Sequence, residues 1–319
     1  MKIIEVVNLT KRISNKMVLN HFEMSLNAGE TVVLLGPSGS GKTTLLECIL
    51  ENEKYDRGEI KLFNKKISQE KSLKNKIGLI PQESAFFYEF SVAENLAFFC
   101  RLYVHDKNKC KENVDDVLQL TGLESIKDRQ AAKLDKNQQK LLNIACGIVH
   151  KPEVILFDEP FLGLDMENKK QVIQLIKQFK QRKQAVLCTS SIADNIEQIC
   201  DRIIIINQGN LIAEGTQKQL RGMVTEKEKI FFEVSLLTEE DLKNLSALPG
   251  VLDSHYEAEK ITFTVNSKNK SLFQIMDYFE QAEIYYSNPE IQESSLSEIL
   301  FELTGISIKE GGVDCLTIY

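Results

Sequence analysis

One short segment of the chain has the residue types and the spacing that hold a chain of phosphates. It follows the apolar run from Thr31 to Leu35 and reads Gly36, Pro37, Ser38, Gly39, Ser40, Gly41, Lys42, Thr43 and Thr44. Glycines let the backbone curl so that N–H groups point inward at an anion, and a helix opening at Gly41 adds the positive end of its dipole. Lys42 supplies charge for the β- and γ-phosphates, and Thr43 supplies a hydroxyl ligand for Mg²⁺. Because GxxxxGK[ST] stands between a strand pattern and a helix pattern, it predicts a phosphate-binding loop rather than a Gly/Ser-rich turn that binds nothing.

Two adjacent carboxylates follow a second apolar run. Asp158 and Glu159 stand directly after Val154 to Phe157, a pattern typical of a buried strand. A carboxylate at the end of a strand can hold Mg²⁺ opposite a phosphate loop, and its neighbour can orient or deprotonate water. Alone this pair is a weak signal. Together with the phosphate loop it indicates hydrolysis of a nucleoside triphosphate.

The composition limits the function classes. The 319 residues are 43% hydrophobic and 27% charged, which is typical of a chain with a packed core and one or two domains. The formal net charge of −7 argues against nucleic acid as a partner. The apolar runs have strand length, the first residues lack a signal-peptide pattern, and the 7 cysteines are scattered without metal spacing. We therefore expect a cytoplasmic protein that needs another subunit if it serves a membrane.

Further motifs make the chain resemble the ATP-binding cassette (ABC) ATPases over about two thirds of its length. Besides the two segments above, the residues that carry the resemblance are Pro81, Gln82, Pro160, Gly163, Leu164, Asp165 and the stretch from Cys200 to Thr216. The resemblance implies an α/β fold: a P-loop NTPase cassette with a RecA-like core, an antiparallel β subdomain and a helical insert at about 83–150.

The resemblance also implies ligands and roles. The ligands are ATP and Mg²⁺. Around the metal it places Thr43, Gln82 and Asp158. Glu159 would orient or deprotonate the attacking water. A loop at the contact between two cassettes would be formed by Gly163, Leu164 and Asp165. Ile13 would lie at the adenine. Ile13 departs from the family, where an aromatic side chain stacks on the base; apolar contact instead of stacking costs about 1–3 kcal/mol.

The segment at the family's signature position departs from Leu-Ser-Gly-Gly-Gln. It reads Leu134, Asp135, Lys136, Asn137 and Gln138. In the family this segment contacts the γ-phosphate of ATP held by the partner subunit. A carboxylate about 4 Å from a phosphate charge is repelled by roughly 4 kcal/mol at an effective dielectric constant near 20. We therefore interpret the segment as a polar loop ahead of a helix at 138–148.

Two further departures affect the shared ATP site. Ser191 stands where the family has a histidine that contacts the γ-phosphate, and Leu162 replaces a small residue before the dimer loop. In a homodimer, both sites would lack the histidine and the signature. In a heterodimer with a fully equipped second ATP-binding subunit, one site would lack the histidine and the other would lack the signature. These departures predict MgATP binding with slow or partner-dependent hydrolysis; the alternative, that a relaxed signature still functions, stays open.

The stretch after Gln82 is predominantly helical and rich in aromatic residues. Ser91 followed by Glu94 predicts a capped helix start. The aromatic residues of interest are Phe86, Phe87, Tyr88 and Phe90. Core packing is the default for such side chains. In the family, however, this region receives a cytoplasmic helix of the membrane subunit, so some of them are candidates for an exposed docking patch.

The character of the chain changes after Gly215. We expect an ATP-binding domain at 1–217, a linker at 218–228, a small α+β domain at 229–305 and a tail at 306–319. The order strand–helix–strand–strand–helix–strand predicts a ferredoxin-like domain, with its last strand at 284–286 and a closing helix after it. This ending resembles the C-terminal extension of bacterial drug- and antibiotic-exporter ATPases; dimer contact, regulation and a purely structural role all stay open.

Taken together, these features predict the ATP-binding subunit of an ABC export system. It would bind and hydrolyse MgATP and lie at the inner face of the cell membrane through a separate transmembrane permease subunit. Its dimer partner would be itself or a second ATP-binding subunit. The alternative is an ATP-sensing module that regulates a membrane partner with little or no hydrolysis.

Overall fold

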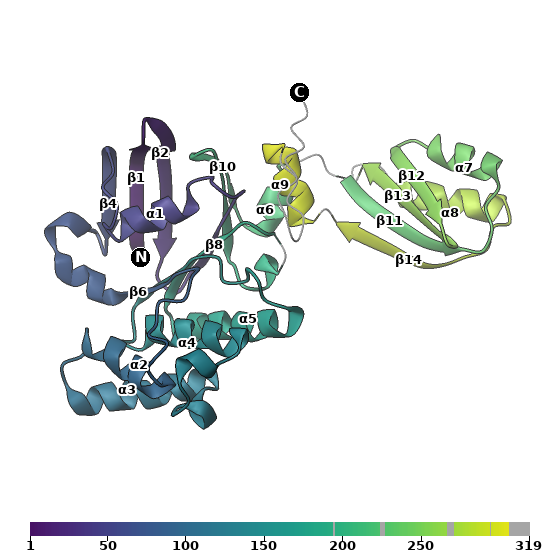
Figure 1. Cartoon of the computed structure of the whole chain (residues 1–319). Coiled ribbons are helices and arrows are strands. Elements are labelled where there is room, and N and C mark those ends of the chain that lie inside the picture. Colours follow the sequence, from purple (N-terminus) through teal and green to yellow (C-terminus); the bar gives the residue numbers. More distant parts are fainter. Residues whose placement is uncertain (194, 224–226, 267–270, 294, 306–319) are drawn as a thin grey trace. The chain divides into compact units, whose positions relative to one another are not determined.

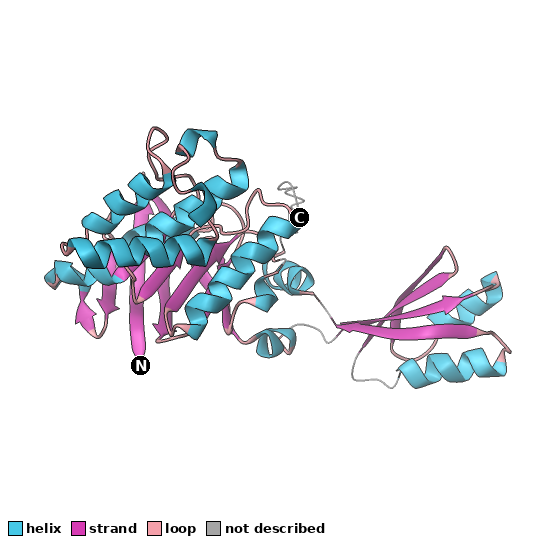
Figure 2. Cartoon of the chain, turned by 90° about the horizontal axis from the view of Figure 1, so that it is seen from below, coloured by secondary structure: helices cyan, strands magenta, loops and turns pink. Residues whose placement is uncertain are grey.

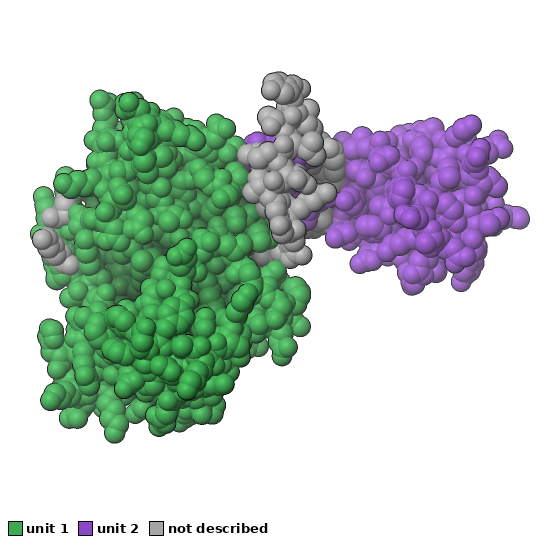
Figure 3. All heavy atoms as spheres, in the orientation of Figure 1, with its two compact units in different colours: residues 1–216, 308–319 green, residues 217–307 purple. Residues whose placement is uncertain are grey.

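The computed structural model describes residues 1–193, 195–223, 227–266, 271–293 and 295–305, and it divides into two compact units (Figure 3). The first unit takes Met1–Thr216, and the second begins at Gln217. The segment expected as a linker, 218–228, includes most of a short helix, α6 (Gln217–Arg221). The expected tail, 306–319, lies outside the described residues.

The first unit is built on a six-stranded sheet in the order β10-β9-β3-β8-β7-β6 (Figure 1). In chain order its strands are β3 (Thr31–Leu35), β6 (Ile77–Ile80), β7 (Val154–Phe157), β8 (Ala185–Ser190), β9 (Arg202–Asn207) and β10 (Asn210–Gly215). All pairs are parallel except the hairpin of β9 and β10. Every residue of β3, β7 and β8 is buried, which explains why these strands are mostly apolar.

A second, antiparallel sheet has the order β2-β1-β4-β5. Its strands are β1 (Lys2–Ile13), β2 (Lys16–Asn27), β4 (Arg57–Leu62) and β5 (Lys65–Lys66). Its apolar residues share one hydrophobic cluster with α1 (Lys42–Ile49) and with residues of the parallel sheet. This is the expected antiparallel β subdomain, and α1, the helix that follows the phosphate loop, packs between its apolar residues and those of the parallel sheet.

Four further α-helices are described in the first unit (Figure 2). They are α2 (Val92–Arg101), α3 (Lys107–Thr121), α4 (Lys136–Ile148) and α5 (Met166–Gln181). Of these, α4 and α5 contact strands of the parallel sheet, and α2 and α3 pack against α4. The predicted capping box at Ser91 and Glu94 starts α2. The expectation of a helix that starts only at 138 is wrong, because Asp135 is the N-cap of α4 and the helix begins at Lys136.

The second unit has the predicted ferredoxin-like fold. Its elements are β11 (Lys227–Val234), α7 (Glu239–Ser246), β12 (Val251–Glu257), β13 (Lys260–Asn266), α8 (Ser271–Gln281), β14 (Tyr286–Glu293) and α9 (Leu296–Thr304). The sheet order is β12-β13-β11-β14 with antiparallel neighbours. The last strand begins later than predicted, because the Ile284 N–H donates to the Phe279 carbonyl and ends α8 instead.

Within the described part of the chain, no helix combines the length and the apolar composition that crossing a bilayer requires.

Candidate functional site

Sheet topology brings the predicted phosphate and carboxylate segments to one edge. The phosphate loop follows β3, Asp158 follows β7 and Ser191 follows β8; in the sheet β8 lies between β3 and β7. The carboxyl ends of parallel strands are where such folds bind ligands. Gln82 follows β6, the neighbour of β7, and its side chain is exposed. The four predicted segments therefore meet at one edge of the sheet.

Glycines shape the phosphate loop because a side chain would not fit. A Cβ at Gly36 would lie 2.1 Å from the Ile206 carbonyl oxygen, and one at Gly41 would lie 2.7 Å from the Val18 carbonyl oxygen. Gly41 is also the N-cap of α1 with φ 108, a left-handed conformation that favours glycine. The first N–H groups of α1 have no acceptor within the helix, so they are free to bind an anion.

Lys42 is a buried cation enclosed by this loop. Its Nζ donates to the carbonyl oxygens of Gly36 at 2.8 Å and Pro37 at 3.1 Å, and it lies 3.4 Å from Glu159 Oε1. Burial lowers the pKa of Lys42, and the Glu159 carboxylate opposes that shift. A buried cation beside the unpaired first N–H groups of α1 suits a polyphosphate.

Oxygen ligands converge beside the loop. Thr43 donates its hydroxyl to Asp158 Oδ2 at 3.0 Å, and Thr189 donates to Asp158 Oδ1 at 2.5 Å. Nearby, the buried Ser40 hydroxyl has no hydrogen-bond partner among the described groups. Hydroxyl and carboxylate oxygens are the donors that Mg²⁺ prefers, so this set fits the ion. Thr43 and Asp158 would hold it, and when bound it would neutralise phosphate charge.

Glu159 is restrained through its backbone and its side chain. Its φ of 47° lies in the left-handed region, which typically costs about 1–3 kcal/mol for a residue with a side chain. Its N–H donates to Thr189 Oγ1 at 3.0 Å. Its Oε2 accepts from the Ser191 N–H at 3.0 Å and from the Ser191 hydroxyl at 3.1 Å. Ser191, the position without the family's histidine, therefore contacts the predicted catalytic carboxylate directly.

Two residues of this site were missed by sequence reasoning. Thr189 joins the side chain of Asp158 to the backbone of Glu159; the only signal was a hydroxyl directly after the apolar run from Ala185 to Cys188. Lys140, on α4, has its Nζ 3.5 Å from the Glu159 carbonyl oxygen. Burial lowers the pKa of Lys140, and the charges of Asp158 and Glu159 oppose the shift. No local pattern distinguished this lysine from a surface one.

The signature segment uses its polar groups within the chain. Asp135 Oδ1 accepts from the Gln138 N–H at 2.8 Å, and Gln138 Oε1 accepts from the Asp135 N–H at 3.2 Å. Asn137 donates to Gln171 Oε1 on α5 at 3.2 Å, and Leu134 is buried. Lys136 is exposed. The carboxylate at the position of the family's serine is thus a helix cap.

The predicted dimer loop and the residue predicted to lie at adenine are exposed. Asp165 caps α5 by accepting from the Asn168 N–H at 2.9 Å. Gly163 has φ 74 and open space where a side chain would be, and Leu164 is half-buried. Leu162 is exposed, and the Ile13 side chain, at the end of β1, is 44% exposed. Both stretches are accessible to a second molecule or a ligand.

Two buried asparagines hold the segment after Gln82. Asn143, on α4, donates to the Pro81 carbonyl oxygen at 2.9 Å and accepts from the Ala85 N–H at 2.9 Å. Asn95, on α2, accepts from the Phe87 N–H at 2.8 Å. The segment that contains Gln82 is therefore attached to the helix that starts at the signature position.

An aromatic cluster lies on this segment and on α2; we define it as Phe87, Tyr88, Phe90 and Phe98. All four side chains are partly exposed, and the ring centroid of Phe87 lies 5.0 Å from that of Phe90 and 4.9 Å from that of Phe98. The candidate Phe86 is wrong as a surface residue, because it is only 7% exposed and belongs to the core.

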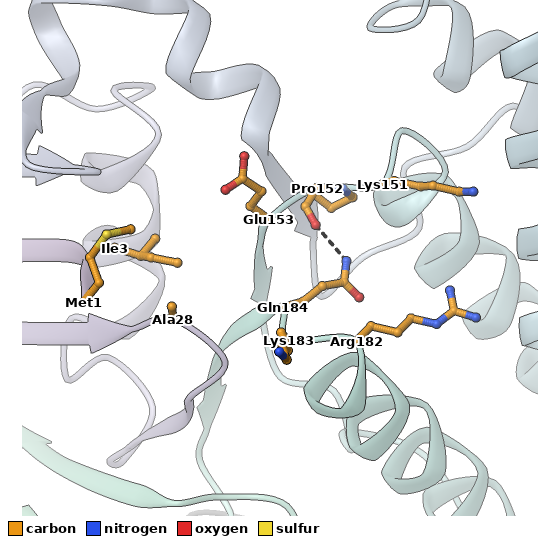
Figure 4. Close-up of a pocket in the computed structure, with 9 residues that line it drawn as sticks. All are labelled: Met1, Ile3, Ala28, Lys151, Pro152, Glu153, Arg182, Lys183 and Gln184. Atoms are coloured by element: carbon orange, nitrogen blue, oxygen red, sulfur yellow. Dashed lines mark hydrogen bonds between the residues drawn. The ribbon is translucent and has the colours of Figure 1, made fainter.

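A cavity of about 390 Å³ lies elsewhere in the first unit (Figure 4). It is lined by Pro152, Glu153 and Gln184, which precede the first residues of β7 and β8, and by Met1 and the β1 residue Ile3. It is therefore at the opposite edge of the parallel sheet from the phosphate loop and is separate from the candidate site.

A phosphate loop after β3, carboxylates after β7, an antiparallel subdomain and a helical layer define a P-loop ATPase of the nucleotide-binding cassette class. The family model "ABC transporter" matches residues 19–162. The Linearmycin resistance ATP-binding protein LnrL of Bacillus subtilis is 29% identical over 310 residues, 96% of this chain and 100% of that protein. The Nod factor export ATP-binding protein I of Burkholderia orbicola is 31% identical over 218 residues, 68% of this chain and 72% of that protein.

The chain therefore belongs to the ABC transporter family, as an ATP-binding subunit. The fold agrees with a dimeric, post-hydrolysis structure of the cassette MJ0796 bound to ADP and Pi, with a TM-score of 0.60. The two chains are 23% identical, and the match covers 67% of this chain and 98% of that one. Subunits of this family are MgATP hydrolases that form dimeric cassettes and work with transmembrane partners. The predicted family, fold, ligands and activity are confirmed at this level.

Proposed function

We propose that this chain powers an export system that removes a toxic compound from the cell. LnrL, a resistance protein, matches both units of the chain and not the cassette alone. The chain would lie at the inner face of the membrane, with the aromatic cluster contacting a cytoplasmic helix of a permease subunit. Exposed aromatic side chains held by buried asparagines suit such a contact, because they bring apolar area without needing to reorder.

The observation that carries ATP hydrolysis is the contact between Ser191 and Glu159. Lys42 and the N–H groups of Gly39 to Thr44 would bind the phosphates. Glu159, with one oxygen facing Lys42 and the other held by Ser191, would orient the attacking water and accept its proton. The serine hydroxyl and backbone N–H thus restrain the carboxylate without the histidine.

The test is steady-state MgATP hydrolysis by the full chain beside its Glu159→Gln variant. General-base catalysis contributes about 10²–10⁴-fold, so we expect turnover to fall by that factor in the variant. ATP binding, followed with a fluorescent ATP analogue, should persist because Lys42 and the loop are unchanged. Equal turnover in both proteins, with binding retained, would favour the ATP-sensing module instead.

A further inference from the structure

One lysine beside the carboxylates lies on the helix that starts at the signature position. Lys140 is in the second turn of α4. Its Nζ lies 3.5 Å from the Glu159 carbonyl oxygen and 5.6 Å from the ring centroid of Phe157, the last residue of β7. A cation within about 6 Å of an aromatic ring face is attracted to it. The lysine side chain therefore lies along the end of β7, where the two carboxylates follow.

No ion pair accounts for the presence of this cation. The Lys140 side chain is half-buried, and burial lowers its pKa, while the charges of Asp158 and Glu159 oppose that shift. Within the described ranges, its hydrogen-bond acceptor is the Glu159 carbonyl oxygen, and no carboxylate is in ion-pair contact with its Nζ. Removing a charge from water without a paired partner costs free energy. A lysine kept beside a nucleotide site at such a cost is a candidate for a role in the chemistry.

The residue that Lys140 contacts has a backbone conformation that needs support. Glu159 has φ 47, and a residue with a side chain persists in this region only when its surroundings hold it there. Its N–H is bound by Thr189 and its carboxylate by Ser191, both from the end of β8. Its carbonyl oxygen accepts from Lys140 and, at 3.4 Å, from the N–H of Leu162 in the following loop. Lys140 therefore supplies the contact to this residue that comes from a helix.

The helix that carries Lys140 is itself held in place. Asn143, three residues later, donates to the carbonyl oxygen of Pro81, directly after β6. Leu141 and Leu142 are buried in the core. Residues three apart lie on the same face of a helix, so Lys140 and Asn143 both face the ends of the parallel strands. Lys140 therefore reaches Glu159 from an anchored element rather than from a loop.

We propose that Lys140 is a positioning residue for ATP hydrolysis: it holds the backbone of Glu159 so that the carboxylate keeps its direction toward the attacking water. This inference rests on the proposed function, because Glu159 is the general base named there, and it adds a group that does not touch ATP. The rival assignment is that the charge of Lys140 acts on Asp158 and, through it, on Mg²⁺. The hydrogen bond to Glu159 favours the first assignment, because a hydrogen bond fixes direction whereas a more distant charge does not.

A double-mutant cycle of turnover in the full chain tests whether Lys140 acts through Glu159. Lys140→Met removes the charge and the donors at similar length, and kcat should fall by about 10-fold, the low end for a hydrogen bond to a charged group, with KM for ATP little changed. In the Glu159→Gln background the same substitution should change kcat by less than about twofold, because the group that it positions is already lost. Lys140→Arg keeps a cation and should recover most of kcat. Lys177→Met, at an exposed position of α5, is the matched control and should leave kcat unchanged.

Two outcomes of the cycle would overturn the proposal. An equal loss of kcat in both backgrounds would mean that Lys140 supports the fold and not Glu159. A change in the Mg²⁺ concentration that gives half-maximal turnover, at unchanged kcat, would assign the lysine to Asp158. If Glu159→Gln itself hydrolyses ATP as fast as the unsubstituted chain, the proposed function fails, and the position of Glu159 must then be measured without turnover.

Amide hydrogen exchange of the chain without ATP provides that measurement. The Ser191 N–H donates to the Glu159 carboxylate, so its exchange reports whether the carboxylate stays in place. We expect this amide to exchange about 10-fold faster in Lys140→Met and at the unsubstituted rate in Lys177→Met. Unchanged exchange in Lys140→Met would show that Glu159 is positioned without the lysine, and it would overturn the proposal whatever the turnover.

Discussion

The two halves of the ATP site differ in how far they keep the family's groups. The half predicted to bind the chain's own ATP retains the phosphate loop, Asp158 and Glu159, and side chains from three neighbouring strand ends hydrogen-bond to one another there. The half predicted to face a partner's ATP has Asp135 where the family has serine, and its polar groups bond within the chain. We infer that the chain has kept its phosphate loop and carboxylates, although not the family's histidine or stacking aromatic residue, and has changed the segment expected to face a partner's ATP.

Backbone geometry explains why the two halves tolerate change differently. No residue but glycine fits at Gly36 or Gly41, because a Cβ would meet a backbone carbonyl. At the position of Asp135, in contrast, the helix start needs only a side-chain hydrogen-bond acceptor, and serine, aspartate and asparagine can each cap a helix there. The first half is restricted by space, whereas the second is restricted only by capping.

The largest expected effect comes from removing the carboxylate of the second half. If the partner is a second copy, Asp135→Asn should raise MgATP turnover, by at most about 10³-fold, since roughly 4 kcal/mol of repulsion at about 4 Å is relieved. Asparagine keeps the cap, so the fold is unaffected. Asp135→Glu, which keeps the charge, is the matched control. Unchanged turnover in Asp135→Asn would mean that this segment does not face the ATP of its own copy.

A smaller loss is expected when the first half is disturbed at Ser191. Ser191→Ala removes one hydrogen bond to the Glu159 carboxylate but leaves the bond from the backbone N–H. A hydrogen bond to a charged group contributes about 1.5–3 kcal/mol, so kcat should fall by about 10–150-fold with KM little changed. Ser191→Thr, which keeps a hydroxyl, should recover most of the activity. A loss in KM alone would show that Ser191 acts on substrate binding rather than on Glu159.

Local pattern was sufficient for most of the first half and for the second unit. The phosphate loop, the carboxylates and the capping box at Ser91 each lie within one short segment, and the ferredoxin-like order follows from alternating elements. Asp135 and Gln138 also form a capping box that the sequence displays, so the polar-loop interpretation overlooked a readable signal.

Contacts between distant segments could not be predicted in this way. Thr189 meets Asp158 because β7 and β8 are neighbours, and Lys140 meets Glu159 because α4 passes the end of β7. Both facts depend on the order of strands and on helix placement. The same holds for the aromatic residues, since nothing in the local sequence separates buried Phe86 from exposed Phe87.

Tighter ATP binding is expected when an aromatic side chain replaces Ile13 in the first half. Ile13, exposed at the end of β1, would offer adenine only apolar contact if it lies at the base as predicted. Ile13→Tyr should tighten ATP binding by about 1–3 kcal/mol, the contribution of a base stacked on an aromatic side chain. Ile13→Leu is the control for size. Calorimetric titration with ATP and with inorganic triphosphate separates the contribution of the base from that of the phosphates, because the substitution should change only the affinity for ATP. An equal change for both ligands would place Ile13 away from the base.

The smallest expected effect is a change in the free energy of unfolding, which tests whether Asp135 acts as a helix cap. Asp135→Ala removes the acceptor for the Gln138 N–H and should lower the free energy of unfolding by about 1 kcal/mol, whereas Asp135→Asn should change it by only a few tenths. Urea unfolding of both variants, with Lys136→Ala as a neighbouring surface control, measures the difference. Equal stability in the alanine and asparagine variants would mean that capping does not account for the residue. Because alanine and asparagine both remove the charge, only the cap separates them, so a stability difference together with unchanged turnover would assign Asp135 to the fold and not to ATP.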